Sequence, residues 1–162
     1  MPKVFISHKS EDSLAAGKIA ERLRTNAVDC YLDVIDPVEV KDGPDLSNYI
    51  RSRMTECTQL MAVVSSATQN SWWVPWEIGV AMEKDFTITS FVTQTVPTIP
   101  SYLKKWPFLR TAEDIDLYAR HIKTFDSRRR VEKLTESMEI FNKSAPRDVA
   151  DFHRTLKRQL GQ

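Results

Sequence analysis

Residues 59–65 have the sequence QLMAVVS, an almost uninterrupted apolar run in a chain of 162 residues. A short run of this kind is typical of a central strand in a parallel sheet, because helices bury both of its faces. Polar residues begin at its last position, Ser65, and continue with Ser66. The segment therefore predicts the middle strand of an α/β domain.

Further short runs have the β-branched and aromatic composition of strands. They lie at residues 3–7, 29–33, 86–93 and 106–110, the last as a short edge strand. Stripes of apolar residues at helical spacing separate them: Leu14, Ile19 and Leu23; Leu46, Tyr49, Ile50 and Met54; Trp76, Ile78, Val80, Ala81 and Met82; and a run at 112–122. Strands that alternate with helices predict a flavodoxin-like α/β fold, with a parallel five-stranded sheet and helices on both faces.

The C-terminal part has two more apolar stripes, one on each side of Pro146. The stripes are Val131, Leu134, Met138 and Phe141, and then Val149, Phe152, Leu156 and Leu160. Because proline interrupts helices, two C-terminal helices are predicted. Residues 127–162 hold nine Lys or Arg against five Asp or Glu. We expect a domain at 1–125 and a helical extension at 126–162 packed on it, with docking to a partner or a second copy as the alternative.

Composition limits the classes of partner. The net charge of +1 gives no reason to expect a nucleic acid or an anionic membrane. The longest unbroken apolar run, 60–64, is far shorter than the roughly 20 residues of a transmembrane helix. The N-terminus lacks the apolar stretch of a signal peptide, so we expect a cytoplasmic protein with Cys30 and Cys57 reduced. The histidines are scattered, and no metal site is expected.

In a parallel sheet of this type, ligands bind beyond the carboxyl ends of the strands, where the strand order reverses. Three polar segments follow predicted strands, at residues 7–11, 33–44 and 65–77. We expect them to converge at that edge.

The same three regions carry motifs, VFISHKSED at 4–12, DVIDPVEVKDGPDL at 33–46 and SWWVPWE at 71–77. Their order and spacing resemble the TIR (Toll/interleukin receptor) domain. The resemblance places Gly43, Pro44 and Asp45 in the family's BB loop, which mediates assembly between copies. It departs from the family's first motif at His8, where tyrosine is usual.

The resemblance implies an enzyme that cleaves NAD. The family's catalytic glutamate lies four residues after a tryptophan that follows a serine by two, and Ser71, Trp73 and Glu77 have this spacing. Substrate contacts are expected from Ser7, His8, Lys9 and Ser10 in the loop after the first strand and from Asp33 at the end of the second. The resemblance adds Trp73. No G-x-G-x-x-G phosphate loop is present, so NAD is expected as a consumed substrate, without a bound cofactor.

One carboxylate is sufficient for this chemistry. Most glycosidases use two carboxyl groups because a poor leaving group must be protonated. The nicotinamide of NAD is a cationic pyridinium that leaves as a neutral molecule. An ionised Glu77 in the first turn of a helix would stabilise the ribosyl oxocarbenium and hold the ribose hydroxyls. An acidic residue at that position is also common without any catalytic role.

Proteins with other functions have a similar fold. A response-regulator receiver is excluded because the predicted third strand ends in Val64, Ser65 and Ser66 where a phosphoacceptor aspartate is needed. A nucleoside deoxyribosyltransferase would also use a glutamate. The main alternative is a non-enzymatic TIR scaffold that acts by self-association. Freestanding bacterial TIR proteins of this size suggest antiviral (antiphage) defence with a separately encoded partner, through an ADP-ribose or cyclic ADP-ribose signal or through NAD depletion.

Overall fold

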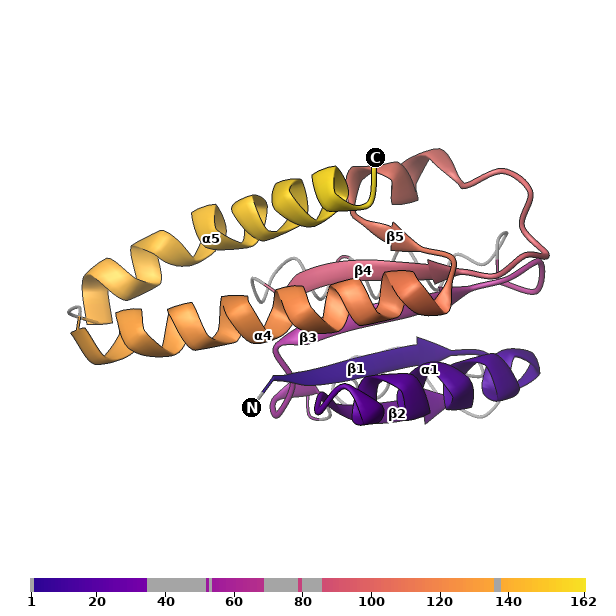
Figure 1. The fold of residues 1–162 in the computed structure, drawn as a ribbon, viewed down its shortest axis with the longest axis horizontal. Helices are drawn as coiled ribbons and strands as arrows, with labels where there is room; N and C mark the ends of the chain where they lie inside the picture. The colour runs from indigo at the N-terminus through magenta and orange to yellow at the C-terminus, as the bar shows by residue number, and fades with distance from the viewer. Residues whose placement is uncertain (1, 35–51, 53, 69–78, 80–85, 136–137) are drawn as a thin grey trace.

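The computed structural model describes residues 2–34, 52, 54–68, 79, 86–135 and 138–162. The elements in chain order are β1 (Lys3–His8), η1 (Ser10–Asp12), α1 (Ser13–Thr25), β2 (Asp29–Val34), β3 (Gln59–Val64), β4 (Thr87–Val92), η2 (Ser101–Lys105), β5 (Phe108–Leu109), α4 (Ala112–Thr135) and α5 (Met138–Gln159). Their arrangement is shown in Figure 1.

The five strands form one parallel sheet in the order β2-β1-β3-β4-β5. This is the flavodoxin-like order, and it reverses between β1 and β3. Ser7 lies in register with Asp33 of β2 on one side and with Ala62 of β3 on the other. The predicted fold class is confirmed, and β3 is its central strand with all six residues buried.

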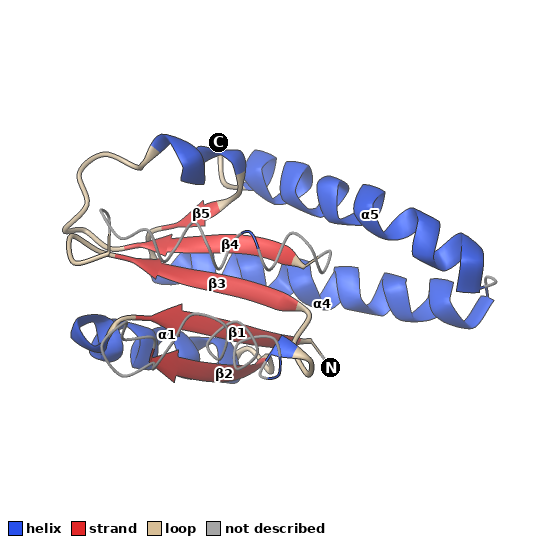
Figure 2. Ribbon diagram, turned by 180° about the vertical axis from the view of Figure 1, so that it is seen from behind, coloured by secondary structure: helices blue, strands red, loops and turns tan. Residues whose placement is uncertain are grey.

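Alternate residues of the strands face opposite sides of the sheet. Val4 and Ile6 of β1 and Met61 of β3 belong to a core shared with α1, α4 and α5, whereas Phe5 and Leu60 belong to a second core on the other face. Figures 1 and 2 show α1 and α4 together on one face. The predicted helices over 46–54 and 76–82 lie outside the described residues, apart from residues 52, 54 and 79, which are helical.

The apolar stripe predicted for the first helix is partly wrong. Ile19 and Leu23 are buried with Ala16 and Ala20, but Leu14 is 74% exposed. Nine residues separate Leu14 from Leu23, about two and a half turns of helix, so their side chains lie on opposite faces. The buried stripe begins at Ala16.

The predicted break at Pro146 is also wrong, because α5 continues through it from Met138 to Gln159. Proline removes one helical hydrogen bond and costs about 3 kcal/mol in a helix interior. α4 extends past the predicted end at residue 122 to Thr135, and α5 begins at Met138. The proposed division at residue 125 stays a prediction.

A buried carboxylate joins the two long helices. Asp148 of α5 is 7% exposed and accepts hydrogen bonds from Arg128 at 3.3 Å and Arg129 at 2.6 Å, both from α4. α4 and α5 extend together beyond the amino-terminal ends of the strands (Figure 2). Among the helices that the structure describes, none is both long and apolar enough to cross a membrane.

The two cysteines lie on opposite sides of the sheet. Cys30 and Cys57 are buried in different cores and form no disulfide. Burial raises the pKa of both thiols, and that of Cys57 reaches about 11. Such thiols stay protonated and react slowly at neutral pH.

Candidate functional site at the carboxyl edge

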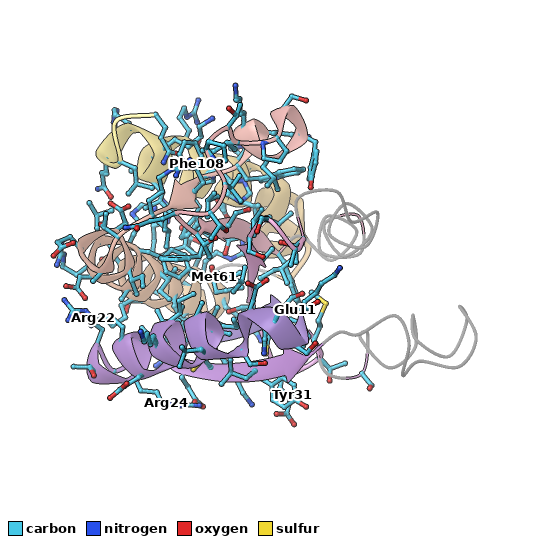
Figure 3. All side chains as sticks on the ribbon, turned by 90° about the vertical axis from the view of Figure 1, so that its right-hand side faces the viewer. Glu11, Arg22, Arg24, Tyr31, Met61 and Phe108 are labelled. Carbon is cyan, nitrogen blue, oxygen red and sulfur yellow. The ribbon has the colours of Figure 1, made fainter. Side chains whose placement is uncertain are left out.

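The carboxyl ends of β1, β2, β3 and β4 lie at one edge of the sheet, because these strands are parallel. Figure 3 views the molecule from this side, with Glu11 of η1 in the foreground and Met61 of β3 within the sheet. Tyr31 of β2 and Phe108 of β5 mark the opposite ends of the strand order. The candidate site lies between them, around the reversal point of β1 and β3.

The end of β1 supplies two buried polar residues, Ser7 and His8, each 5% exposed. Ser7 continues the strand register with Asp33, which lies near the carboxyl end of β2. His8 pairs in register with Val34. The sheet therefore brings three of the sequence-predicted substrate residues, Ser7, His8 and Asp33, to neighbouring positions.

His8 carries a buried ring nitrogen, Nδ1, that has no hydrogen-bond partner among the described residues. Burial lowers the pKa of the ring, against smaller raising effects from the Ile6 backbone and from Asp12. The ring is therefore neutral at physiological pH. A buried polar atom without a partner costs free energy and is often completed by a ligand or water.

Lys9 and Ser10 follow β1 directly. The Lys9 ammonium donates to the carbonyl of Ala67 at 3.1 Å, which joins the loops after β1 and β3. An ammonium has three N–H donors, and the bond to Ala67 is the only one that Lys9 makes to a described residue. Ser10 is exposed and its hydroxyl donates to Glu11 at 3.2 Å. Lys9 is thus fixed near the edge, whereas Ser10 lies on the surface.

A buried network holds the loops after β1 and β3 together. The Ser65 hydroxyl donates to Asp12 Oδ2 at 2.7 Å and accepts from the Ala67 N–H at 3.1 Å. The Ser65 N–H donates to Thr68 Oγ1 at 2.6 Å. Asp12, Ser65 and Thr68 are all less than 9% exposed. Because each group has a partner, the network fixes the backbone from which residues 69–77 continue.

The end of β4 joins the same edge. The Thr93 N–H donates to the carbonyl of Val64 at 2.9 Å, and Thr95 Oγ1 accepts from the Ser66 N–H at 3.1 Å. The Thr93 and Thr95 hydroxyls are hydrogen-bonded to each other at 2.7 Å. Three consecutive strand ends along the sheet are therefore linked through side chains.

Several predicted site residues lie outside the described residues. They are the candidate catalytic residue Glu77, the substrate-contact candidate Trp73, and the BB-loop residues Gly43, Pro44 and Asp45. Their roles stay predictions from the sequence.

The sequence placed Ser65 and Thr68 at this edge within the segment 65–77, but it did not single them out, and it left Asp12 outside the segment 7–11. Ser65 had a usable signal, because a polar residue directly after a buried strand lies at the ligand-binding edge of a parallel sheet. Asp12 had no such signal in the sequence, because its hydrogen-bond partner Ser65 is 53 positions away. Among the described residues, no three His, Cys, Asp or Glu side chains gather in a way that would hold a metal ion.

Two cavities among the described residues lie away from this edge. One, of about 620 Å³, lies between α4 and α5 and is lined in part by His121, Phe125 and Phe152. The other, of about 510 Å³, is lined by residues of η2 and α5. Neither cavity is lined by a residue of the carboxyl edge. The candidate site at the edge is therefore defined by its polar groups and not by either cavity.

Fold and edge together define a class: a flavodoxin-like α/β protein with a polar ligand edge and no glycine-rich phosphate loop. Within that class, the model of the TIR domain family matches residues 4–135. The chain therefore belongs to the TIR family.

Individual proteins do not extend the family assignment. None of the curated proteins compared with the chain matches it. A 3-dehydroquinate dehydratase-like protein from Bifidobacterium longum is similar in structure, with a TM-score of 0.48 and 11% identity over 75% of this chain and 98% of that one. A diflavin flavoprotein A3 from Nostoc sp. has a TM-score of 0.43 and 14% identity over 97% and 94% of the two chains.

Proposed function

We propose that this TIR domain cleaves the N-glycosidic bond of NAD and releases nicotinamide, with ADP-ribose or cyclic ADP-ribose as the second product. The observation that carries the proposal is Glu77, which stands at the family's catalytic position relative to Ser71 and Trp73, in a chain that the family model matches from residue 4 to residue 135. TIR domains include both enzymes and scaffolds. The retained glutamate favours the enzyme.

The described edge supports this proposal through the groups that it offers to a ribose and a diphosphate. The buried Nδ1 of neutral His8 has no partner among the described residues, which suits a ribose hydroxyl. Lys9 uses one of its three N–H donors within the described part of the chain, for Ala67, and the others suit an anionic oxygen. Ser7 and Asp33 occupy neighbouring register positions of β1 and β2, which suits the substrate contacts predicted for both residues.

In the proposed reaction, the bond between the ribose C1′ and the nicotinamide nitrogen breaks, and its electron pair neutralises the pyridinium. The ribose is left as an oxocarbenium, which an ionised Glu77 stabilises by charge and by binding the ribose hydroxyls. Water then adds to C1′ and loses a proton to solvent, or a nucleophile of the ADP portion adds and closes a ring. No general acid is needed.

Assembly and context are part of the proposal. Copies would associate through TIR contacts, with Gly43, Pro44 and Asp45 of one copy completing the site of the next. A separately encoded partner would supply the trigger or respond to the product, as in antiphage defence signalling. Trp73 would lie against the nicotinamide ring.

The test is nicotinamide release, followed by chromatography, from concentrated and artificially oligomerised protein supplied with NAD. We expect Glu77→Gln to lower the rate about a hundredfold or more, since it keeps the shape and removes the charge. Glu113→Gln is the matched control, because Glu113 is an exposed glutamate in the first turn of α4, and Glu77 is predicted from the sequence to lie in the first turn of a helix. Its rate should equal that of the wild type.

Two results would contradict the proposal. Equal rates for wild type and Glu77→Gln would remove Glu77 from the mechanism. Absence of release from every assembled form, with assembly verified by light scattering, would favour the scaffold.

A further inference from the structure

A basic hollow lies beside the edge strand β5, on the far side of β4 from the candidate site. It is lined by Lys105 and Trp106 next to η2 and by His153, Arg154, Lys157 and Arg158 of α5, and its volume is about 510 Å³. Among the lining residues that the structure describes, four are Lys or Arg and none is Asp or Glu. This balance contrasts with the whole chain, whose net charge is +1.

His153 is held in this hollow by the backbone of β4. Its Nε2 accepts a hydrogen bond from the Ile88 N–H at 2.8 Å. Ile88 and Ser90 point their N–H groups to the same side of β4, and Ser90 is bonded to Pro107 next to β5. Because β5 has only two residues, the ring of His153 takes the place of a strand at Ile88.

This bond fixes what the ring can offer a ligand. With Nε2 used as an acceptor, the proton of the neutral ring must be on Nδ1. Burial, followed by the charges of Lys105 and Lys157, lowers the pKa of His153 to about 4. The ring is therefore a neutral N–H donor at physiological pH, and the charges around it are positive.

The cations come from two segments and are held around the hollow. The Lys105 ammonium lies 5.2 Å from the centre of the Trp106 ring, and the Lys157 ammonium donates to the carbonyl of Lys104 at 2.6 Å, which joins α5 to η2. Arg154 is paired with Asp151. Within the described part of the chain, one of the four charges is thus paired with a carboxylate, and the other three have no ion pair and are offered to an anion.

A concave site with several cations and N–H donors and without a carboxylate fits phosphate oxygens. One phosphate group cannot contact cations on both η2 and α5 as fully as a chain of phosphates can. A linear polyanion such as a nucleic acid is better matched by a stripe of cations along a surface than by one hollow. A cavity of this size also lies within the range of small-molecule sites.

We propose that the hollow between η2 and the C-terminal half of α5 binds a small molecule that carries two or three adjacent phosphate groups. This site is independent of the proposed NAD cleavage, because it shares no residue with the carboxyl edge. Ile88 and Val92 are separated by about 13 Å along β4, at the rise of a parallel strand. The bond to His153 is thus made toward the opposite end of β4 from the candidate site.

The test is calorimetric titration of the full chain with sodium tripolyphosphate as the probe. Removing two charges with Lys105→Gln and Arg158→Gln should weaken binding at least about tenfold, as expected for the loss of charge-assisted contacts. Both residues are exposed, so the fold should be retained. The matched control removes two exposed cations of α1, with Lys18→Gln and Arg24→Gln, and should change the affinity by less than about twofold.

Additional titrants identify the source of the phosphates. Orthophosphate should bind at least about tenfold more weakly than tripolyphosphate, because it reaches fewer cations. ATP that binds more tightly than tripolyphosphate would assign a nucleotide, and equal affinities would assign the phosphates alone. Either result supports the site.

Three results would overturn the proposal. The first is that the wild type does not bind tripolyphosphate. The second is that the Lys105→Gln, Arg158→Gln variant and the α1 control lose equal affinity. The third is that a short oligonucleotide binds the wild type more tightly than tripolyphosphate does, and that this binding is lost in the variant of the hollow but kept in the α1 control. The last would assign a nucleic acid instead.

Discussion

Two regions of this TIR domain each bury a neutral histidine against the sheet, and they use it in opposite ways. The Nε2 atom of His153, beside β4, accepts a hydrogen bond from the Ile88 N–H. It thereby completes the backbone hydrogen bonding of an edge that β5 is too short to cover. His8, at the end of β1, has a buried Nδ1 without a partner among the described residues. The comparison separates a histidine whose ring nitrogen completes the sheet from one whose buried Nδ1 has no partner among the described residues, for which we propose a ligand.

The largest expected effect concerns His153 in acid. Its folded pKa of about 4 lies below the ordinary 6.5, so the unfolded chain binds the proton first, and stability falls as the pH drops from 6.5 towards 4. Linkage gives a loss of roughly 2–3 kcal/mol by about pH 4.5. Urea unfolding at that pH and at neutral pH measures it.

His153→Gln is the control for this effect, because its amide oxygen can accept from Ile88 but does not titrate. The pH-dependent loss in the variant should be smaller than that of the wild type by roughly 2 kcal/mol. Equal losses in the two proteins would mean that His153 titrates normally in the folded state.

The next effect breaks the network that supports the carboxyl edge. Asp12→Ala leaves the buried Ser65 hydroxyl without its acceptor and should lower the free energy of unfolding by about 2 kcal/mol. Asp126→Ala is the comparison, since it removes only an exposed pair with Arg130 and should cost about 0.5 kcal/mol or less. Equal costs in chemical denaturation would show that the Asp12 network does not stabilise this edge.

The smallest expected effect is the most informative about His8. His8→Phe removes a buried Nδ1 that has no described partner, together with the ring's interaction with the Ile6 backbone, so the free energy of unfolding should fall by about 1 kcal/mol or less. His153→Phe should cost about 1–2 kcal/mol, because it leaves the Ile88 N–H unsatisfied. A large loss in thermal unfolding of His8→Phe would mean that its ring is needed by the fold.

These differences also show what the sequence could predict. The apolar run that became β3 indicated a central parallel strand, and the polar residues after β1 and β2 indicated the edge where a ligand would bind. The local sequence pattern was sufficient to predict β3, because a strand that is buried on both faces has a continuous apolar run.

The remaining features depend on contacts between distant residues. The bond from Ser65 to Asp12 and the bond from Ile88 to His153 join positions 53 and 65 residues apart, and no periodicity marks them. Leu14 followed the helical pattern yet lies in solvent, because three apolar positions did not define the buried face. Pro146 followed the rule for helix breakers, yet α5 continues through it.

The most direct test of the carboxyl edge as the NAD site is nitrogen-15 NMR of the histidine rings in Glu77→Gln, which should bind NAD without cleaving it. The chain has three histidines, so the ring signals can be assigned by single substitution. On addition of NAD, we expect the His8 nitrogens to shift while those of His121, in the cavity between α4 and α5, stay unchanged. A His8 signal that does not respond up to millimolar NAD would contradict the account.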